Sequence, residues 1–293
     1  MIDHTIVHLS HRALISVSGP DWASFLKGLC TAHIDPLAEA ANKGEFLKPY
    51  YGAFLRPQGK MICDALLHAV SSDEVRIDIP LCERDELVAK LNMYRLRAKV
   101  TIAPIDLPVH VAFGHNLPDG FMVDPRKSII DSNFGVAYGW TGETTDLAAW
   151  TAFRFAQGLS DPGLDFARDD LYPIDANLDL LGAIDFHKGC YVGQELTSRM
   201  KRRGQIKNRI LPFRYVGDRL PATGAEVLSG ERRAGYVLAA ENGLGLGLIR
   251  VDRRGGPLSA DSIEMMLNIP NWIAPHLPET GPEIGPKIGP GDV

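Results

Sequence analysis

The sequence predicts an α+β fold followed by a small antiparallel β-barrel, and two features of the apolar pattern support this. In roughly the first hundred residues, strand-like and helix-like patterns follow one another in the order strand–strand–strand–helix–strand. Beyond about residue 205, short strands are separated by turns that contain glycine or proline. The chain has 293 residues, which is long for one compact core, so we expect two or three modules.

The first strand and helix follow from the spacing of apolar residues near the N-terminus. Residues 12–17 alternate in the manner of a half-buried strand. Trp22, Phe25, Leu26 and Leu29 then recur at the spacing that places them on one face of a helix.

A β-hairpin is predicted next. Residues 51–55 and 61–70 resemble two strands, and Arg56-Pro57-Gln58-Gly59 between them matches the preferences of a type I turn. The elements expected after the hairpin are a strand at 75–79, a helix at 81–92 and a strand at 98–102.

The second half of the chain is expected to contain one more helix, the barrel and a tail. Residues 144–157 form an amphipathic pattern that Gly158 ends. From Pro270 onward proline and glycine dominate, so we predict that 270–293 is disordered. The barrel strands are expected at 210–215, 226–228, 235–238 and 246–251.

Composition excludes several classes of function. A net charge of −5 gives no general reason to expect nucleic acid, and no apolar run is long enough to span a bilayer. The N-terminus resembles neither a signal peptide nor a transit peptide, so we expect a cytoplasmic protein with reduced thiols. The four cysteines are far apart and form no Cys-x-x-Cys pair, so a metal centre on one of them needs ligands from a partner or a small thiol.

Cys190 is the candidate reactive residue. It follows His187, Lys188 and Gly189, and a polar helical segment begins just after it. Positive charge and a helix N-terminus both lower the pKa of a thiol, and the thiolate is the form that ligates metals. Apolar neighbours give the remaining cysteines a structural interpretation; these are Cys30, Cys63 and Cys82.

Several segments resemble the YgfZ-type proteins, which are folate-binding-fold factors for iron–sulfur cluster assembly. Residues 188–195, Lys-Gly-Cys-Tyr-Val-Gly-Gln-Glu, followed by Arg199, resemble the family signature. The segments that lead into the signature and that open the fold are also similar; they are residues 173–179, 184–186, 19–28 and 55–61. The resemblance covers about residues 10–255.

The resemblance implies both a fold and a function. The fold is that of the glycine cleavage T-protein, with two interleaved ferredoxin-like modules over residues 1–203 and a β-barrel over 204–269. The function is maturation or repair of iron–sulfur proteins of the [4Fe–4S] type. Cys190 then ligates or transfers a cluster shared with an A-type carrier protein, which serves client apo-proteins.

The resemblance also assigns roles around Cys190. Lys188 is expected to keep the thiol ionised, and the glycines at 189 and 193 to shape the loop. The remaining binding residues of the motif are Tyr191, Gln194, Glu195 and Arg199, of which the last three are expected to hold the loop in place.

Tetrahydrofolate is the cofactor that the resemblance implies, with Asp64, Asn177 and Asp179 as its contacts. Two departures weaken this expectation. The paired aspartates of the aminomethyltransferases are reduced to Cys63-Asp64, and Ala156 replaces a pterin-holding glutamate. A folate-dependent aminomethyl- or methyltransferase that uses Asp64 is therefore the alternative function.

A dense basic run over residues 199–214 has three interpretations. It is a solvated linker face, an anion site for a folate tail or an acidic partner, or an RNA-binding segment. No aromatic residue lies between Arg199 and Arg209, which argues against stacking on RNA bases.

Overall fold

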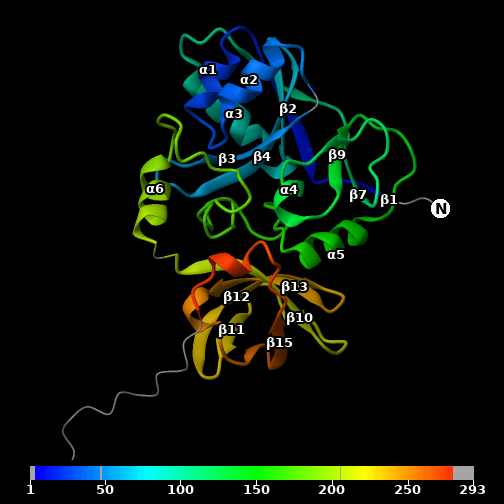
Figure 1. Cartoon of the computed structure of the whole chain (residues 1–293), viewed down its shortest axis with the longest axis vertical. Coiled ribbons are helices and arrows are strands. Elements are labelled where there is room, and N and C mark those ends of the chain that lie inside the picture. The colour runs from blue at the N-terminus through cyan, green and yellow to red at the C-terminus, as the bar shows by residue number, and fades with distance from the viewer. Residues whose placement is uncertain (1–3, 47, 205, 280–293) are drawn as a thin grey trace, which may run out of the picture.

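The computed structural model describes residues 4–46, 48–204 and 206–279. Two antiparallel sheets lie side by side in the upper part of the molecule, and a β-barrel lies below them (Figure 1). Within the described residues, no helix is both long and apolar enough to cross a membrane.

The larger sheet has five strands in the order β3-β4-β5-β2-β6. It confirms the strands predicted in the first hundred residues, including the hairpin around Gly59. Its strands are β2 (Arg12–Ser18), β3 (Tyr50–Leu55), β4 (Met61–Ser71), β5 (Glu74–Pro80) and β6 (Thr101–Ile105). The helices that pack with it are α1 (Trp22–Lys27), α2 (Ile34–Asn42) and α3 (Arg84–Arg95).

The smaller sheet explains the interleaving of the two modules. Its strand β1 (His4–His8) pairs with β7 (Val109–Gly114), about a hundred residues later. The chain therefore starts in one sheet, builds the other, and returns. The remaining elements of this module are β8 (Met122–Val123), α4 (Lys127–Ile130), β9 (Phe134–Tyr138) and α5 (Leu147–Gln157).

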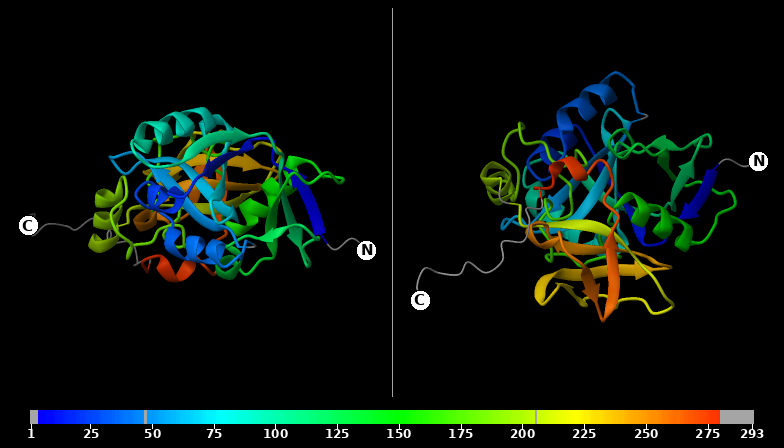
Figure 2. Two further views of the ribbon diagram at one scale, coloured as in Figure 1. Left: turned by 90° about the horizontal axis from the view of Figure 1, so that it is seen from above. Right: turned by 60° about the horizontal axis from the view of Figure 1, so that its bottom comes forward.

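Six strands form the closed barrel, in the order β10-β13-β12-β11-β14-β15 (Figure 2). A Cβ atom on Gly245 would lie 2.4 Å from the ring of Phe213, so the glycine-rich strand serves close packing. The strands are β10 (Asn208–Tyr215), β11 (Glu226–Ser229), β12 (Arg232–Glu241), β13 (Leu244–Arg250), β14 (Leu258–Ala260) and β15 (Ile263–Leu267).

The predicted disordered tail begins too early. Trp272 donates a hydrogen bond from Nε1 to the carbonyl of Gln157 at 2.9 Å, and Ile273 is fully buried against the barrel. A short 3-10 turn, Ala274–His276, follows. The prediction failed because a few apolar residues among the prolines are enough to dock this segment. Residues 280–293 of the predicted tail lie outside the described residues.

The segment between α5 and the barrel has little regular structure until α6 (Gln194–Arg203). Figures 1 and 2 place α6 on the opposite side of the molecule from β1. The Cys190 loop leads directly into α6, so the candidate site lies at this outer edge.

Candidate functional site

Cys190 is exposed, in a loop that leads into the N-terminus of α6. Gly193 ends this loop with a φ of +84°, a conformation that favours glycine. A Cβ atom at this position would lie 2.6 Å from the carbonyl oxygen of Arg56 and 2.9 Å from the Cβ of Leu55. Glycine at 193 therefore lets the loop press against the β3–β4 hairpin while the thiol stays in solvent.

Cys190 lines a groove with a volume of about 840 Å³. The hairpin contributes Pro57, and α3 contributes Tyr94. The other residues along the groove come from the loop and α6; they are Phe186, Cys190, Tyr191, Val192, Gly193, Gln194, Glu195, Ser198, Lys201 and Arg202. The sequence predicted the loop and α6 side but not Pro57 and Tyr94, which are distant along the chain.

Lys188 anchors the Cys190 loop to the segment between α1 and α2. Its ammonium donates hydrogen bonds to the carbonyls of Cys30 at 2.6 Å and Ala32 at 2.7 Å. Burial lowers the pKa of Lys188. The sequence assigned Lys188 the role of keeping Cys190 ionised, but these contacts direct its charge toward the body of the protein.

Asp185 fixes the preceding turn. Its carboxylate accepts hydrogen bonds from the backbone N–H groups of His187 at 2.8 Å and Lys188 at 3.2 Å. Its own N–H donates to the carbonyl of Thr31 at 3.0 Å. The sequence matched this residue to the segment before the signature but gave it no role.

Tyr191 is the buried member of the motif. Only 6% of it is exposed, and the Lys188 ammonium lies 5.2 Å from its ring centroid. Burial raises the pKa of Tyr191 to about 12, so its hydroxyl stays neutral. Gln194 contributes through its backbone N–H, which donates to the Tyr191 carbonyl.

The structure corrects the roles expected for Glu195 and Arg199. Both side chains are exposed on α6, so they do not hold the loop in place. Glu195 lies in the first turn of the helix, where the helix dipole favours a negative charge.

The other cysteines differ from Cys190 in their surroundings. Cys30 and Cys63 are buried, and burial raises the pKa of both thiols. Cys82 is exposed, contrary to the expectation of a core residue, and its partial burial and Glu83 raise its pKa. These three thiols are therefore poorer thiolates than a free cysteine.

Metal-ligating side chains do not gather around Cys190 within the described residues. Across residues 4–279, apart from positions 47 and 205, no group of three or more His, Cys, Asp or Glu side chains is placed to hold a metal ion. The cluster on Cys190 with thiolates from another molecule stays a prediction.

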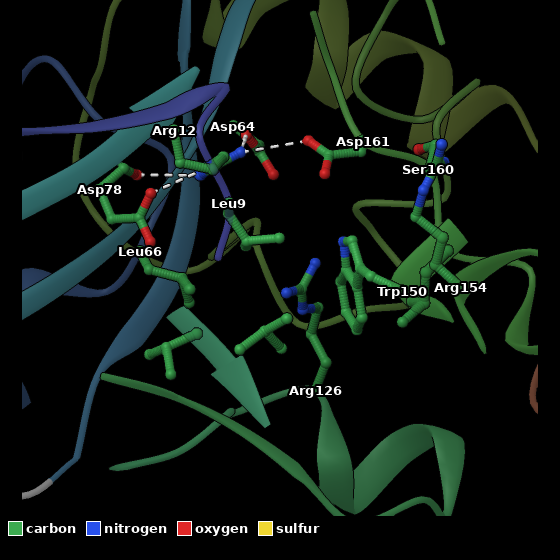
Figure 3. Close-up of a pocket in the computed structure, with 13 residues that line it drawn as sticks. Leu9, Arg12, Asp64, Leu66, Asp78, Arg126, Trp150, Arg154, Ser160 and Asp161 are labelled. Carbon is green, nitrogen blue, oxygen red and sulfur yellow. Dashed lines mark hydrogen bonds and ion pairs between the residues drawn. The ribbon is translucent and has the colours of Figure 1, made fainter. Parts of the chain in front are cut away.

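A second candidate site lies between the two sheets and α5, and an ion cluster around Arg12 forms one side of it (Figure 3). Arg12 donates hydrogen bonds to Asp64 at 2.9 Å and Asp78 at 2.8 Å, and lies 3.5 Å from Asp161. Tyr51 donates a further bond to Asp64. The cavity left beside these residues has a volume of about 30 Å³.

Tetrahydrofolate does not fit this cavity as the side chains stand. Pockets for ligands of that size span roughly 300–1,000 Å³, whereas this cavity has space for about one water molecule. Asp64, the expected folate contact, is already held by Arg12 and Tyr51. Ala156 is exposed on α5, so a glutamate at that position would not face the cavity.

Asn177 and Asp179 do not join Asp64 at this cavity. They bind Arg209, which is buried and donates hydrogen bonds to Asp179 at 2.6 and 3.0 Å and to Asn177 at 3.2 Å. Asn177 also donates to the carbonyl of Ile210. These residues fasten strand β10 to the upper part of the molecule. Arg209 is therefore not part of the exposed basic surface that the sequence suggested.

Comparisons with known proteins agree with this architecture. Residues 207–275 match a family model described as the CAF17 C-terminal β-barrel domain. The chain is 29% identical to the mouse iron–sulfur cluster assembly factor IBA57, covering 92% of this chain and 85% of the relative. The human IBA57 protein is also 29% identical, with 90% and 84% covered.

The fungal relatives are longer than the region they share with this chain. An IBA57 homologue from Mycosarcoma maydis is 28% identical over 72% of this chain, and the match spans 57% of that relative. One from Pyricularia oryzae is 33% identical, with 70% and 56% covered. The relatives found here are IBA57 assembly factors, and the barrel matches that of CAF17. From the sequence we named the YgfZ-type proteins instead.

A solved structure has the same fold. The aminomethyltransferase T of the glycine cleavage system from Bartonella henselae superposes with a TM-score of 0.70, covering 90% of this chain and 85% of that chain. The identity is 15%, so this similarity concerns the fold alone. It confirms the T-protein-like fold class predicted from the sequence.

The expected localisation needs correction. We predicted a cytoplasmic protein because the N-terminus lacks a recognisable targeting pattern. The mouse, human and fungal relatives are all named as mitochondrial proteins, which contradicts that prediction.

Proposed function

We propose that this protein assists the maturation or repair of iron–sulfur proteins, of the [4Fe–4S] type, and that Cys190 is the thiolate that acts on the cluster. The similarity to iron–sulfur cluster assembly factors supports the role in maturation. The exposure of Cys190 in a wide groove, on a loop whose base is anchored by hydrogen bonds, is the observation that carries the assignment of the residue.

The surroundings of Cys190 suit ligand exchange. A thiolate that passes a cluster must bind iron and release it again, so it needs solvent access and room for a second molecule. The groove provides both, and the N-terminus of α6 adds a positive dipole end four residues after the cysteine.

The proposal includes partners. An A-type carrier protein supplies the other thiolates, and client apo-proteins receive the cluster. The incompleteness of the Cys190 site within the described residues supports a shared cluster over one held by this chain alone.

Aminomethyl or methyl transfer, the alternative, has less support. A general base needs access to the proton that it removes. Asp64 is 3% exposed, accepts hydrogen bonds from Arg12 and Tyr51, and borders a cavity with space for about one water molecule. We therefore place no step of the proposed function at Asp64.

Complementation tests the proposed function. In cells that lack their native factor, the wild-type chain is expected to restore the activity of [4Fe–4S] enzymes, whereas Cys190→Ser fails. Serine keeps its proton at neutral pH and is a poor iron ligand. Cys82→Ser is the matched control, because it removes the other exposed thiol, and it is expected to restore activity. Full rescue by Cys190→Ser would contradict the proposal.

A further inference from the structure

An apolar lip, formed by Met93, Tyr94 and Leu96, lies at the C-terminal end of α3. Leu96 is 88% exposed and Met93 is 64% exposed, so folding leaves most of both side chains in water. Large apolar side chains gathered in this way are typical of interaction sites.

The backbone at Leu96 adds a second observation. It has a φ of +42° and a ψ of −101°, a conformation that is unfavourable for a leucine and easy for a glycine. The strained backbone of Leu96 costs free energy on folding, and its exposed apolar side chain contributes no burial that would offset this cost. Both features are explained if the side chain is used in binding.

The apolar lip adjoins the Cys190 groove. Tyr94 lines that groove, and Leu96 follows two residues later, within about 7.6 Å between Cα atoms. A protein that delivers thiolates to Cys190 must cover the groove. The edge of such a protein then contacts the apolar lip.

Charge around this surface indicates the chemistry of the occupant. Four exposed cations lie along this surface: Lys201 and Arg202 line the groove, and Arg95 and Arg97 flank Leu96 along the chain. Lys201 is partly neutralised by Asp179, whose carboxylate lies 3.5 Å from its ammonium, so Arg95, Arg97 and Arg202 carry most of the positive charge. Among the groove-lining residues, Glu195 is the carboxylate. An acidic protein surface complements this arrangement and is steered toward it.

We propose that the apolar lip is the docking surface for an acidic protein that brings the remaining thiolate ligands of the shared cluster. This inference rests on the proposed function and adds the contact residues, with Leu96 as the apolar anchor at the edge of the groove. The cations set the orientation and the rate of association, and the apolar contact sets the lifetime of the complex.

The test measures the affinity of this chain for an apo A-type carrier by calorimetry. Leu96→Asp is expected to weaken binding at least tenfold, and Met93→Gln severalfold. Arg97→Glu is expected to slow association and to reduce its dependence on salt. Val216→Asp is the matched control, because Val216 is 87% exposed on the barrel and its replacement leaves the affinity unchanged.

Leu96→Gly separates binding from folding. It relieves the unfavourable backbone, so the melting temperature is expected to rise while the affinity for the carrier falls. A purely structural leucine would give a lower melting temperature and no change in affinity, and that result would overturn the inference.

Other outcomes distinguish the two proposals. Wild-type binding that Leu96→Asp changes by less than twofold overturns the docking surface and leaves the role of Cys190 intact. A dimer of this chain that depends on Leu96, seen by sedimentation without the carrier, assigns the apolar lip to a second copy and also overturns it. Absence of any complex with the wild-type chain, in apo or cluster-loaded carrier, contradicts the proposed function itself.

Discussion

Replacing Arg12 with leucine tests whether the ion cluster around Arg12 stabilises the folded protein. The guanidinium is bound to Asp64, Asp78 and Asp161, and its side chain is 6% exposed. Leucine fills part of the volume but leaves these carboxylates without their shared cation. Breaking a buried ion pair from one side costs about 3–5 kcal/mol. We expect a loss of that size in the free energy of unfolding at pH 7, measured by urea denaturation.

The loss is predicted to depend on pH. Burial raises the pKa of Asp78, and the charge of Arg12 opposes that rise. At Asp161, where burial also acts to raise the pKa, the hydrogen bond from His11 and the charge of Arg12 hold the pKa below its usual range. Removing Arg12 therefore raises both pKa values in the folded state. The folded variant then binds protons that the unfolded chain has released. Its stability therefore falls more steeply than that of the wild type as pH rises above the carboxyl pKa of about 4 in the unfolded chain.

Arg250→Leu is the matched control for the Arg12 experiment. It removes an exposed arginine paired with Asp252, and such pairs contribute about 0–1 kcal/mol. If both variants lose the same small amount, the ion cluster does not stabilise the fold. Calorimetry on the wild type should also find no nanomolar binding of tetrahydrofolate, and tight binding would show that the cavity opens.

Three other predictions concern single features of the fold. Burial raises the pKa of Asp175 to about 6, so the wild type loses roughly 2 kcal/mol of stability as pH rises from about 4 through about 6; Asp175→Asn should abolish this slope in denaturation curves, and an unchanged slope would refute it. Lys188→Met should speed hydrogen exchange over residues 185–192 and leave the rate of Cys190 alkylation within about twofold of the wild type; a much slower alkylation would restore the role predicted from the sequence. Truncation after residue 270 should lower the melting temperature by several degrees through loss of Trp272 and Ile273, whereas truncation after 279 is the control, and equal melting temperatures would show that the docked turn contributes nothing.

The sequence was a good guide where structure is local. Strands β2 and β5 of the larger sheet largely alternate apolar and polar residues, and the turn of the β3–β4 hairpin has the expected proline and glycine. The sequence also singled out Cys190 from its neighbours, histidine, lysine and glycine, and the structure leaves this cysteine exposed.

Contacts between distant segments could not be predicted in the same way. Strand β1 is short, and its pairing with β7 is set by the fold rather than by its own pattern. Arg12 looked like the polar end of a strand, yet it binds three buried carboxylates. Lys188 stands near Cys190 in sequence, but its flexible side chain turns to the carbonyls of Cys30 and Ala32.

The predicted folate contacts illustrate a different limit. Asn177 and Asp179 matched the lead-in segment of the related family, and a match of residue types does not specify their partners. In the structure both bind Arg209, a residue that the sequence placed in a basic surface run. Which polar residues face each other depends on how the barrel docks, and no local pattern carries that information.

The most direct test of the central claim is the spectrum and stoichiometry of the cluster formed with the carrier. Wild-type chain, apo carrier, iron and sulfide are mixed anaerobically, and the complex is isolated and analysed for iron and for visible absorption. We predict one cluster per heterodimer with thiolate-to-iron absorption, and we expect this absorption to be lost or markedly shifted in Cys190→Ser but not in Cys82→Ser. A cluster with an unchanged spectrum and stoichiometry in Cys190→Ser would contradict it.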